Sequence, residues 1–150
     1  ENKTIITALR SNVTVTSGQK AILICMFDSI NQDLLLLSSH QLIWIRQSHA
    51  SYDADLILAH NQDLLISDDR LNIQRTHIDY TLTITNVKID DEGTYVCEVN
   101  TQPPKKAIIY LCVQVKLHAR IEMINKEIVR FILIVYTKHK KIKMRMPDKY

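Results

Sequence analysis

Three cysteines, Cys25, Cys97 and Cys112, carry the most distinctive chemistry in this chain of 150 residues. Thiols form disulfides, bind metal ions or act as nucleophiles, and an odd number in a secreted chain suggests one disulfide and one remaining thiol. Cys97 and Cys112 stand on either side of a Pro-Pro pair, whereas Cys25 is distant in sequence. Which two of them are partners depends on the strands that carry them.

The other reactive side chains show no catalytic or metal-binding spacing. The six histidines are scattered, and none stands with Cys or acidic residues at a spacing typical of metal ligands. Two glycines are too few for a Gly-rich phosphate loop, and nothing places Ser, His and Asp as a triad. We therefore predict a protein that is not an enzyme and that uses no cofactor or metal.

The net charge of +3 is divided unevenly along the chain. Residues 1–117 hold 10 Lys and Arg against 13 Asp and Glu, whereas residues 118–150 hold 9 against 3. This break near Leu117 predicts a domain over residues 1–117 followed by a basic tail over 118–150. An acidic domain with a basic tail is a poor match to a nucleic-acid-binding protein, so we predict no nucleic-acid partner.

Residues 1–117 have the pattern of short strands separated by turns. In "QLIWIRQ", Leu42 and Trp44 share one face of a strand, and Ile43 and Ile45 share the other. Comparable segments recur about every 10 residues, which is typical of an all-β sandwich or barrel. A hairpin is expected over Leu56–Ser67, with its turn at His60–Asp63. The "LLLL" run at Leu34–Leu37 falls in a long loop, where we expect it to be partly buried.

Two sequons are compatible with passage through the secretory route. They place candidate N-glycosylation at Asn2 (Asn2-Lys3-Thr4) and Asn12 (Asn12-Val13-Thr14). No signal peptide is visible at the start of the chain, which indicates that this start is already processed or truncated.

Cys25, Trp44 and Cys97 each lie on the inward face of a predicted strand, in the order Cys, Trp, Cys. Together with "LIWIRQ" and "LTITNVKIDDEGTYVC", this order resembles the variable-like domains of the immunoglobulin superfamily over residues 10–117. The resemblance implies an all-β, two-sheet Greek-key sandwich of the V type, with an irregular or helical tail after it. It also implies a disulfide between Cys25 and Cys97, with Trp44 packed against it.

Three further residues match the same family pattern. Tyr95, two positions before Cys97, stands where the fold has its tyrosine corner. Arg70 opens the strand after the hairpin, and the resemblance implies that it pairs with Asp91. Cys112 alternates to the opposite face from Leu111 and Val113, so we expect a free thiol there, or an intermolecular disulfide.

Finer features are similar to the first domains of the Dpr-interacting proteins and their Dpr, lachesin and IgLON relatives. These features are "LILAHNQDLLISDDRLNI" and "CEVNTQPPKKAIIYLCVQV". Cys25 and Trp44 are 19 positions apart, several more than is usual in this family, and the extra length falls in "SINQDLLLLSS". After Leu117 the family normally continues into a second immunoglobulin domain, which this chain does not show.

The resemblance implies that partners join through the sheet face that carries Trp44, Cys97 and the last strand. Alternation predicts which side chains point outward there, and they form an unusually apolar patch with a polar margin. A tail or loop of the chain itself is the alternative cover. The predicted interface consists of Ile43, Ile45, Gln47, Val96, Glu98, Asn100, Ile108, Tyr110 and Cys112, with Leu58 and His60 from the hairpin beside it.

These features predict an extracellular module at the plasma membrane surface that binds another immunoglobulin-superfamily protein, heterophilically or homophilically, in neuronal adhesion and synaptic partner choice. One alternative is a secreted or immune-type module that binds a non-immunoglobulin ligand.

In the tail, the apolar run Phe131–Tyr136 is too short to span a bilayer. With "KHKKIKMR" after it, the run could rest on an anionic membrane surface as a peripheral binder. From composition we favour a disordered or aberrant tail over this alternative.

Overall fold

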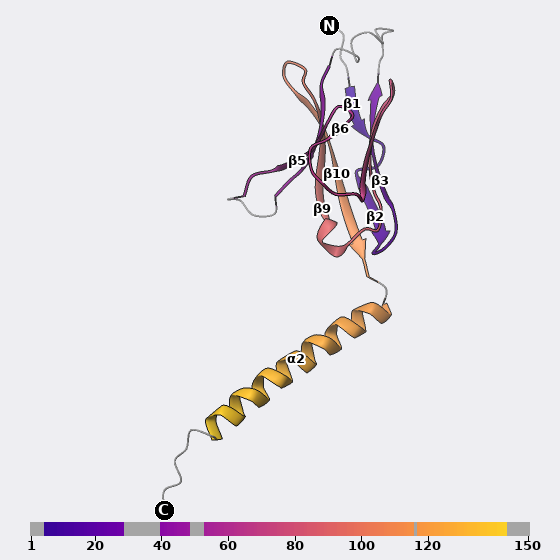
Figure 1. Ribbon diagram of the computed structural model, residues 1–150. Coiled ribbons are helices and arrows are strands. Elements are labelled where there is room, and N and C mark those ends of the chain that lie inside the picture. Colours follow the sequence, from indigo (N-terminus) through magenta and orange to yellow (C-terminus); the bar gives the residue numbers. More distant parts are fainter. Residues whose placement is uncertain (1–4, 29–39, 49–52, 116, 144–150) are drawn as a thin grey trace, which may run out of the picture. The chain divides into compact units, whose positions relative to one another are not determined.

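The computed structural model describes residues 5–28, 40–48, 53–115 and 117–143. The chain divides into two compact units, residues 1–114 and 115–150 (Figure 1). The first unit is a sandwich of two β-sheets, and the second contains a single described helix.

The four-stranded sheet is antiparallel throughout. Its strands, in spatial order, are β1 (Ile5–Ala8), β3 (Ala21–Asp28), β8 (Asp79–Ile84) and β7 (Leu71–Arg75). In the six-stranded sheet, β2 pairs in parallel with β10, and every other pair is antiparallel. Its order is β2 (Asn12–Thr16), β10 (Lys105–Gln114), β9 (Gly93–Val99), β4 (Leu42–Arg46), β5 (Leu56–His60) and β6 (Asp63–Leu64).

The N-terminal segment contributes one strand to each sheet. The family resemblance over residues 10–117 covers β2 but not β1, which pairs with β3 before the chain crosses to the other sheet. After β2, the turn at Gly18 has φ of +88°, a conformation that L side chains rarely adopt and glycine adopts freely. The turn leads the chain to β3, so β2 is connected at both of its ends to strands of the four-stranded sheet.

The core lies between the sheets, and its centre is built from two register pairs. Trp44 lies beside Cys97 on β4 and β9, and Tyr80 lies beside Cys25 on β8 and β3. The rings of Trp44 and Tyr80 stack across the sandwich, with centroids 5.8 Å apart. All four side chains are fully buried, so the predicted inward faces of these strands meet in one hydrophobic core.

One end of the sandwich is held by a polar cluster around the 3₁₀ turn η1 (Ile89–Asp91). Arg70 donates from Nη1 to Asp91 Oδ2 at 2.6 Å and from Nη2 to Asp91 Oδ1 at 3.0 Å. It also donates from Nη2 to Asp68 at 2.8 Å. Tyr95 Oη donates to the carbonyl oxygen of Asp91 at 2.7 Å, the geometry of a tyrosine corner. Burial raises the pKa of Tyr95 to about 12, so the phenol keeps the proton that it donates.

In the second unit, residues Leu117–Lys143 form the helix α2. The conformation is therefore helical over most of the segment for which composition favours disorder. The side chains of residues 121–137 are all exposed. Across the described part of the chain, no helix is both long and apolar enough to cross a membrane.

Candidate functional site

The outer face of the six-stranded sheet carries an apolar row that crosses four strands. Strand pairing places Ile57 of β5 beside Ile45 of β4, Ile45 beside Val96 of β9, and Val96 beside Ile108 of β10. Ile57 and Ile108 are 46% and 58% exposed. Val96 is only 3% exposed, although it lies outside the core cluster. It lies on the outer face between Ile45 and Ile108, and these neighbours account for its low exposure. This row is a continuous aliphatic strip.

A more polar row lies alongside the strip. Pairing aligns His60, Ile43, Glu98 and Lys106 across the same four strands. Lys106 Nζ lies 2.9 Å from Glu98 Oε2, and the hydrogen bond and negative charge of Glu98 raise the pKa of Lys106. Sequence reasoning treats Glu98 as available to a partner, but its carboxylate is already engaged by a lysine that this reasoning missed. The pair therefore presents a positive and a negative group together.

The third row lies on the other side of the strip. Gln47 N donates to Thr94 O at 2.9 Å, Thr94 pairs with Tyr110, and Tyr110 pairs with Asn12 of the edge strand β2. Tyr110 is 40% exposed, and Gln47 and Asn12 are also exposed. Asn12 therefore belongs to the same surface as Tyr110, although the two residues are almost a hundred positions apart in sequence.

Two more predicted interface residues occupy the margin of this surface. Asn100 is exposed, but its Oδ1 accepts a hydrogen bond from Gln41 N at 2.7 Å, so its side chain helps to hold the end of β4. Cys112 is half-buried and pairs with Thr14, two positions along from the Tyr110–Asn12 pair. The surface formed by the three rows and Cys112 is called the outer face below.

The prediction that Leu58 contributes to this surface is wrong. Leu58 is 2% exposed and belongs to the core cluster. The register between β4 and β5 shifts at a β-bulge, where Trp44 pairs with Ala59 but Ile45 pairs with Ile57. The extra residue breaks the inward–outward alternation, so Leu58 and Ala59 are both buried. Ile57, which the sequence reasoning omitted, takes the outward position.

The turn that follows β5 fixes the position of His60 on the sheet. Asn61 has φ of +52°, and its backbone N donates to Leu42 O at 2.7 Å. Asn61 Oδ1 accepts from Leu42 N at 3.0 Å and from Arg75 Nη1 at 2.6 Å. The hairpin is thereby joined to β4 and to β7, and the half-buried His60 is held at the edge of the outer face.

The three cysteines separate as alternation predicts. Cys25 and Cys97 are buried thiols in the core. Burial raises the pKa of the Cys97 thiol, and so does its hydrogen bond with Cys25. Cys112 lies on the same six-stranded sheet as Cys97 but on its opposite face. The core pair is placed for a disulfide, which stays a prediction.

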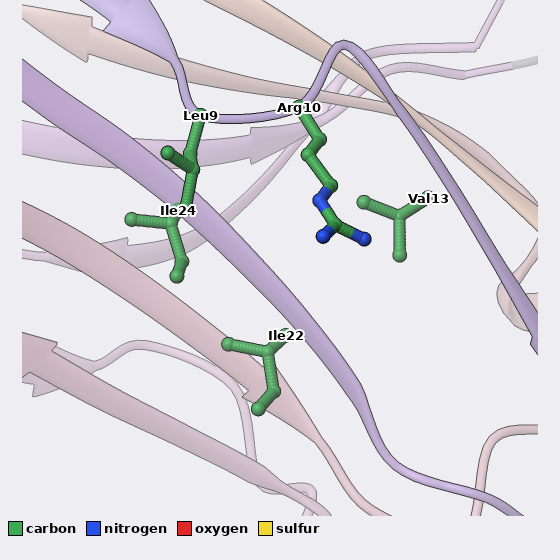
Figure 2. Close-up of a pocket in the computed structure, with 5 residues that line it drawn as sticks. All are labelled: Leu9, Arg10, Val13, Ile22 and Ile24. Atoms are coloured by element: carbon green, nitrogen blue, oxygen red, sulfur yellow. The ribbon is translucent and has the colours of Figure 1, made fainter.

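A small hollow lies on the other sheet, beside the crossing from β1 to β2 (Figure 2). Its volume is about 260 Å³, and its lining is aliphatic apart from Arg10. Ligand pockets usually have about 300–1,000 Å³ and several convergent polar groups. The hollow is therefore weaker as a site than the outer face. Among the described residues, no cluster of three or more His, Cys, Asp or Glu could hold a metal ion.

Some predicted features lie outside the described residues. These are the sequon at Asn2 and the Leu34–Leu37 run. Within the described residues, sequence reasoning missed Ile57, Lys106, Thr94 and the position of Asn12. Alternation in "KKAIIYLC" could have placed Lys106, but no local signal reveals a bulge or the partner of an edge strand.

Comparison with known proteins matches this arrangement to one family. The immunoglobulin V-set domain family matches residues 9–115. The limbic system-associated membrane protein of Rattus norvegicus is 33% identical over 106 residues, which are 69% of this chain and 27% of that protein. The chain therefore spans about a quarter of the length of this relative.

Solved structures of immunoglobulin domains have the same fold. The complex of Dpr1 IG1 with DIP-eta IG1 matches with a TM-score of 0.59 and 25% identity, covering 76% of this chain and 96% of the matched chain. The Ig1 domain of mouse SynCAM 2 matches with a TM-score of 0.59 and 25% identity, covering 77% and 99%. The complex of Dpr2 Ig1-Ig2 with DIP-Theta Ig1-Ig3 matches with a TM-score of 0.60 and 26% identity, covering 75% and 48%.

Two of these solved structures contain immunoglobulin domains bound to one another. The matched domain family is non-enzymatic, and the similarity extends to relatives of the neuronal adhesion class. Since the family match covers most of the chain and the sandwich carries the fold's core residues, the chain belongs to the immunoglobulin V-set domain family.

Proposed function

We propose that this domain acts at the cell surface by binding a second immunoglobulin domain through its outer face, in neuronal adhesion and partner choice. The observation that carries the proposal is the row Ile57–Ile45–Val96–Ile108, an aliphatic strip across four paired strands. Contiguous exposed apolar surface with a polar margin is typical of protein-binding sites. Immunoglobulin domains bound to one another among the similar structures support this kind of partner.

The rows suggest how the free energy of binding is divided. The strip provides aliphatic burial, which contributes about 25 cal/mol for each Å² of apolar surface removed from water. The side chains of Tyr110 and Gln47 on one side, and the Glu98–Lys106 pair on the other, provide orientation and selectivity. A partner that places opposite charges against Glu98 and Lys106 keeps both ionic groups satisfied, whereas an apolar partner surface leaves them desolvated.

A binding screen with one charge substitution tests the proposal. The full chain is screened against cell-surface immunoglobulin ectodomains, including Dpr, Dpr-interacting and IgLON first domains and the chain itself. Replacing Ile45 at the centre of the strip with Asp should weaken any binding found by on the order of 100-fold, since a buried carboxylate without a partner opposes association. Surface plasmon resonance measures the change.

A matched control separates the outer face from the opposite sheet. Ile57 on β5 is 46% exposed, and Ile22 on β3 of the other sheet is 48% exposed. Ile57→Asp should weaken binding and Ile22→Asp should not, while both variants keep the circular dichroism spectrum of the parent. Binding that survives Ile57→Asp and is lost with Ile22→Asp would place the site on the other sheet and refute the proposal.

The exposed side chains of α2 favour peripheral membrane binding as a second candidate function. Phe131–Tyr136 is a run of apolar residues, and every one of its side chains is exposed. Aromatic and aliphatic side chains next to basic residues are typical of interfacial helices. Co-sedimentation with liposomes that contain anionic lipid tests this function: the full chain should sediment and residues 1–117 should not. Equal sedimentation of both would refute it.

A further inference from the structure

Asn12 combines a modification sequence with an unusual position in the fold. It is the acceptor of the sequon Asn12-Val13-Thr14 and begins β2, the edge strand of the six-stranded sheet. The side chains of Asn12 and Thr14 are both exposed. Asn12 Nδ2 donates a long hydrogen bond of 3.4 Å to Ser11 Oγ, and this contact is exposed. The amide of Asn12 is therefore accessible to an enzyme.

The pairing of β2 shows which side of the sheet Asn12 faces. Leu111 pairs with Val13, Leu111 is buried, and Val13 packs against the core. Asn12 and Thr14 alternate with Val13 and so point outward, beside Tyr110 and Cys112 respectively. Asn12 is therefore the corner of the outer face, one strand away from Tyr110.

We propose that Asn12 carries an N-linked glycan that closes the β2 side of the outer face and confines a partner to β10, β9, β4 and β5. Adjacent strands are about 4.8 Å apart, so a branched oligosaccharide on Asn12 borders Tyr110, which stays open to the partner, and shields the end of β10 at Cys112. It also covers the outer backbone edge of β2, which would otherwise offer unpaired groups to another strand. The position of this boundary rests on the proposed function, but the modification itself does not.

The oligosaccharide is transferred to Asn12 from a lipid-linked oligosaccharide diphosphate. The bond between the anomeric carbon of the first sugar and the phosphate oxygen breaks. A bond forms from that carbon to Asn12 Nδ2, which loses one proton to a base. The lipid diphosphate leaves with the electron pair of the broken bond, so no oxidant or reductant takes part.

Glycopeptide mass spectrometry on the full chain, secreted from animal cells, tests occupancy. Asn2→Gln removes the other sequon, so that any remaining N-glycan reports on Asn12. In that background the glycan should persist with Thr14→Ser, which keeps the sequon hydroxyl, and disappear with Thr14→Ala. An unmodified Asn12 in the secreted Asn2→Gln protein would overturn the proposal.

The reactivity of Cys112 tests the shielding without any partner protein. Cys112 lies on the same face, about 6–7 Å along β10 from Tyr110, whereas Cys25 and Cys97 are buried. After mild reduction, a polymer-linked maleimide should label Cys112 several-fold more slowly in the Thr14→Ser protein than in the Thr14→Ala protein. Iodoacetamide, which is small, should react with both at the same rate.

Each result bears on a separate part of the inference. Occupied Asn12 with equal maleimide rates would overturn the shielding. Because both measurements use the unbound chain, failure of the proposed binding function would leave them unchanged, and the two failures are distinguishable.

Discussion

At the scale of single residues, the core cysteines have the sharpest chemical consequence. Cys25 and Cys97 are buried beside the stacked rings of Tyr80 and Trp44, their neighbours on the adjacent strands. Burial and the neighbouring Cys25 thiol raise the pKa of Cys97, so its thiol has little thiolate character for reactions with soluble reagents. Cys112 is only half-buried on the outer face, so soluble reagents reach its thiol more readily than those of Cys25 and Cys97.

Oxidation should join Cys25 to Cys97. The bond would close a loop of about 70 residues, for which the chain-entropy model gives a stabilisation of roughly 4 kcal/mol. Non-reducing peptide mapping identifies the linked peptides, and urea unfolding with and without reductant measures the difference in free energy. A linkage between Cys97 and Cys112 would contradict the prediction.

The ion pair between Arg70 and Asp91 predicts a dependence of stability on pH. Burial raises the pKa of Asp91, but the hydrogen bonds from Arg70 and from the Lys88 backbone outweigh it, so the pKa lies below 3.8. A lowered folded-state pKa gives stability that is present above the unfolded-state value and is lost as the pH falls through the folded-state value. We expect Asp91→Asn to cost about 2 kcal/mol at pH 7.

Urea unfolding between neutral pH and pH 3 checks this expectation, because the difference from the parent should shrink below about pH 4. Asp68 is the control. It also contacts Arg70, and its side chain is 30% exposed against 10% for Asp91. Asp68→Asn should cost less than about 1 kcal/mol. A pH-independent cost of Asp91→Asn would contradict the assignment.

At the scale of elements, the bulge in β5 decides which side chains build the outer face. It directs Leu58 into the core and Ile57 outward. We expect Leu58→Ala to lower the free energy of unfolding by about 2–4 kcal/mol, the usual cost of a buried Leu→Ala change. Ile57→Ala should lower it by less than about 1 kcal/mol. Chemical denaturation measures both, and comparable costs would show that alternation continues through β5 without a bulge.

At the scale of the whole molecule, the two units differ in what holds them together. All residues of the hydrophobic core cluster lie between Ile6 and Val113, within the first unit. Residues 1–117 should therefore fold alone and unfold at the same midpoint as the full chain. Calorimetry on the truncated and full chains checks this, and a large fall in the midpoint after truncation would refute it.

The sequence by itself determined the fold class and the centre of the core. The order of Cys25, Trp44 and Cys97 and the period of two along each strand are local signals, and the prediction of a V-type immunoglobulin sandwich is confirmed by the family match. The same period correctly separates Leu111 and Val113 from Ile108 and Tyr110. Alternation is reliable where a strand pairs without interruption, because successive side chains must then point to opposite faces.

Only the tertiary structure decided how the outer face is bounded. The bulge that buries Leu58 arises from the register between β4 and β5. The ion pair of Lys106 with Glu98 and the place of Asn12 beside Tyr110 arise from which strands meet. Register and edge pairing are set by contacts between segments far apart in the chain, so a periodic pattern within one segment cannot specify them.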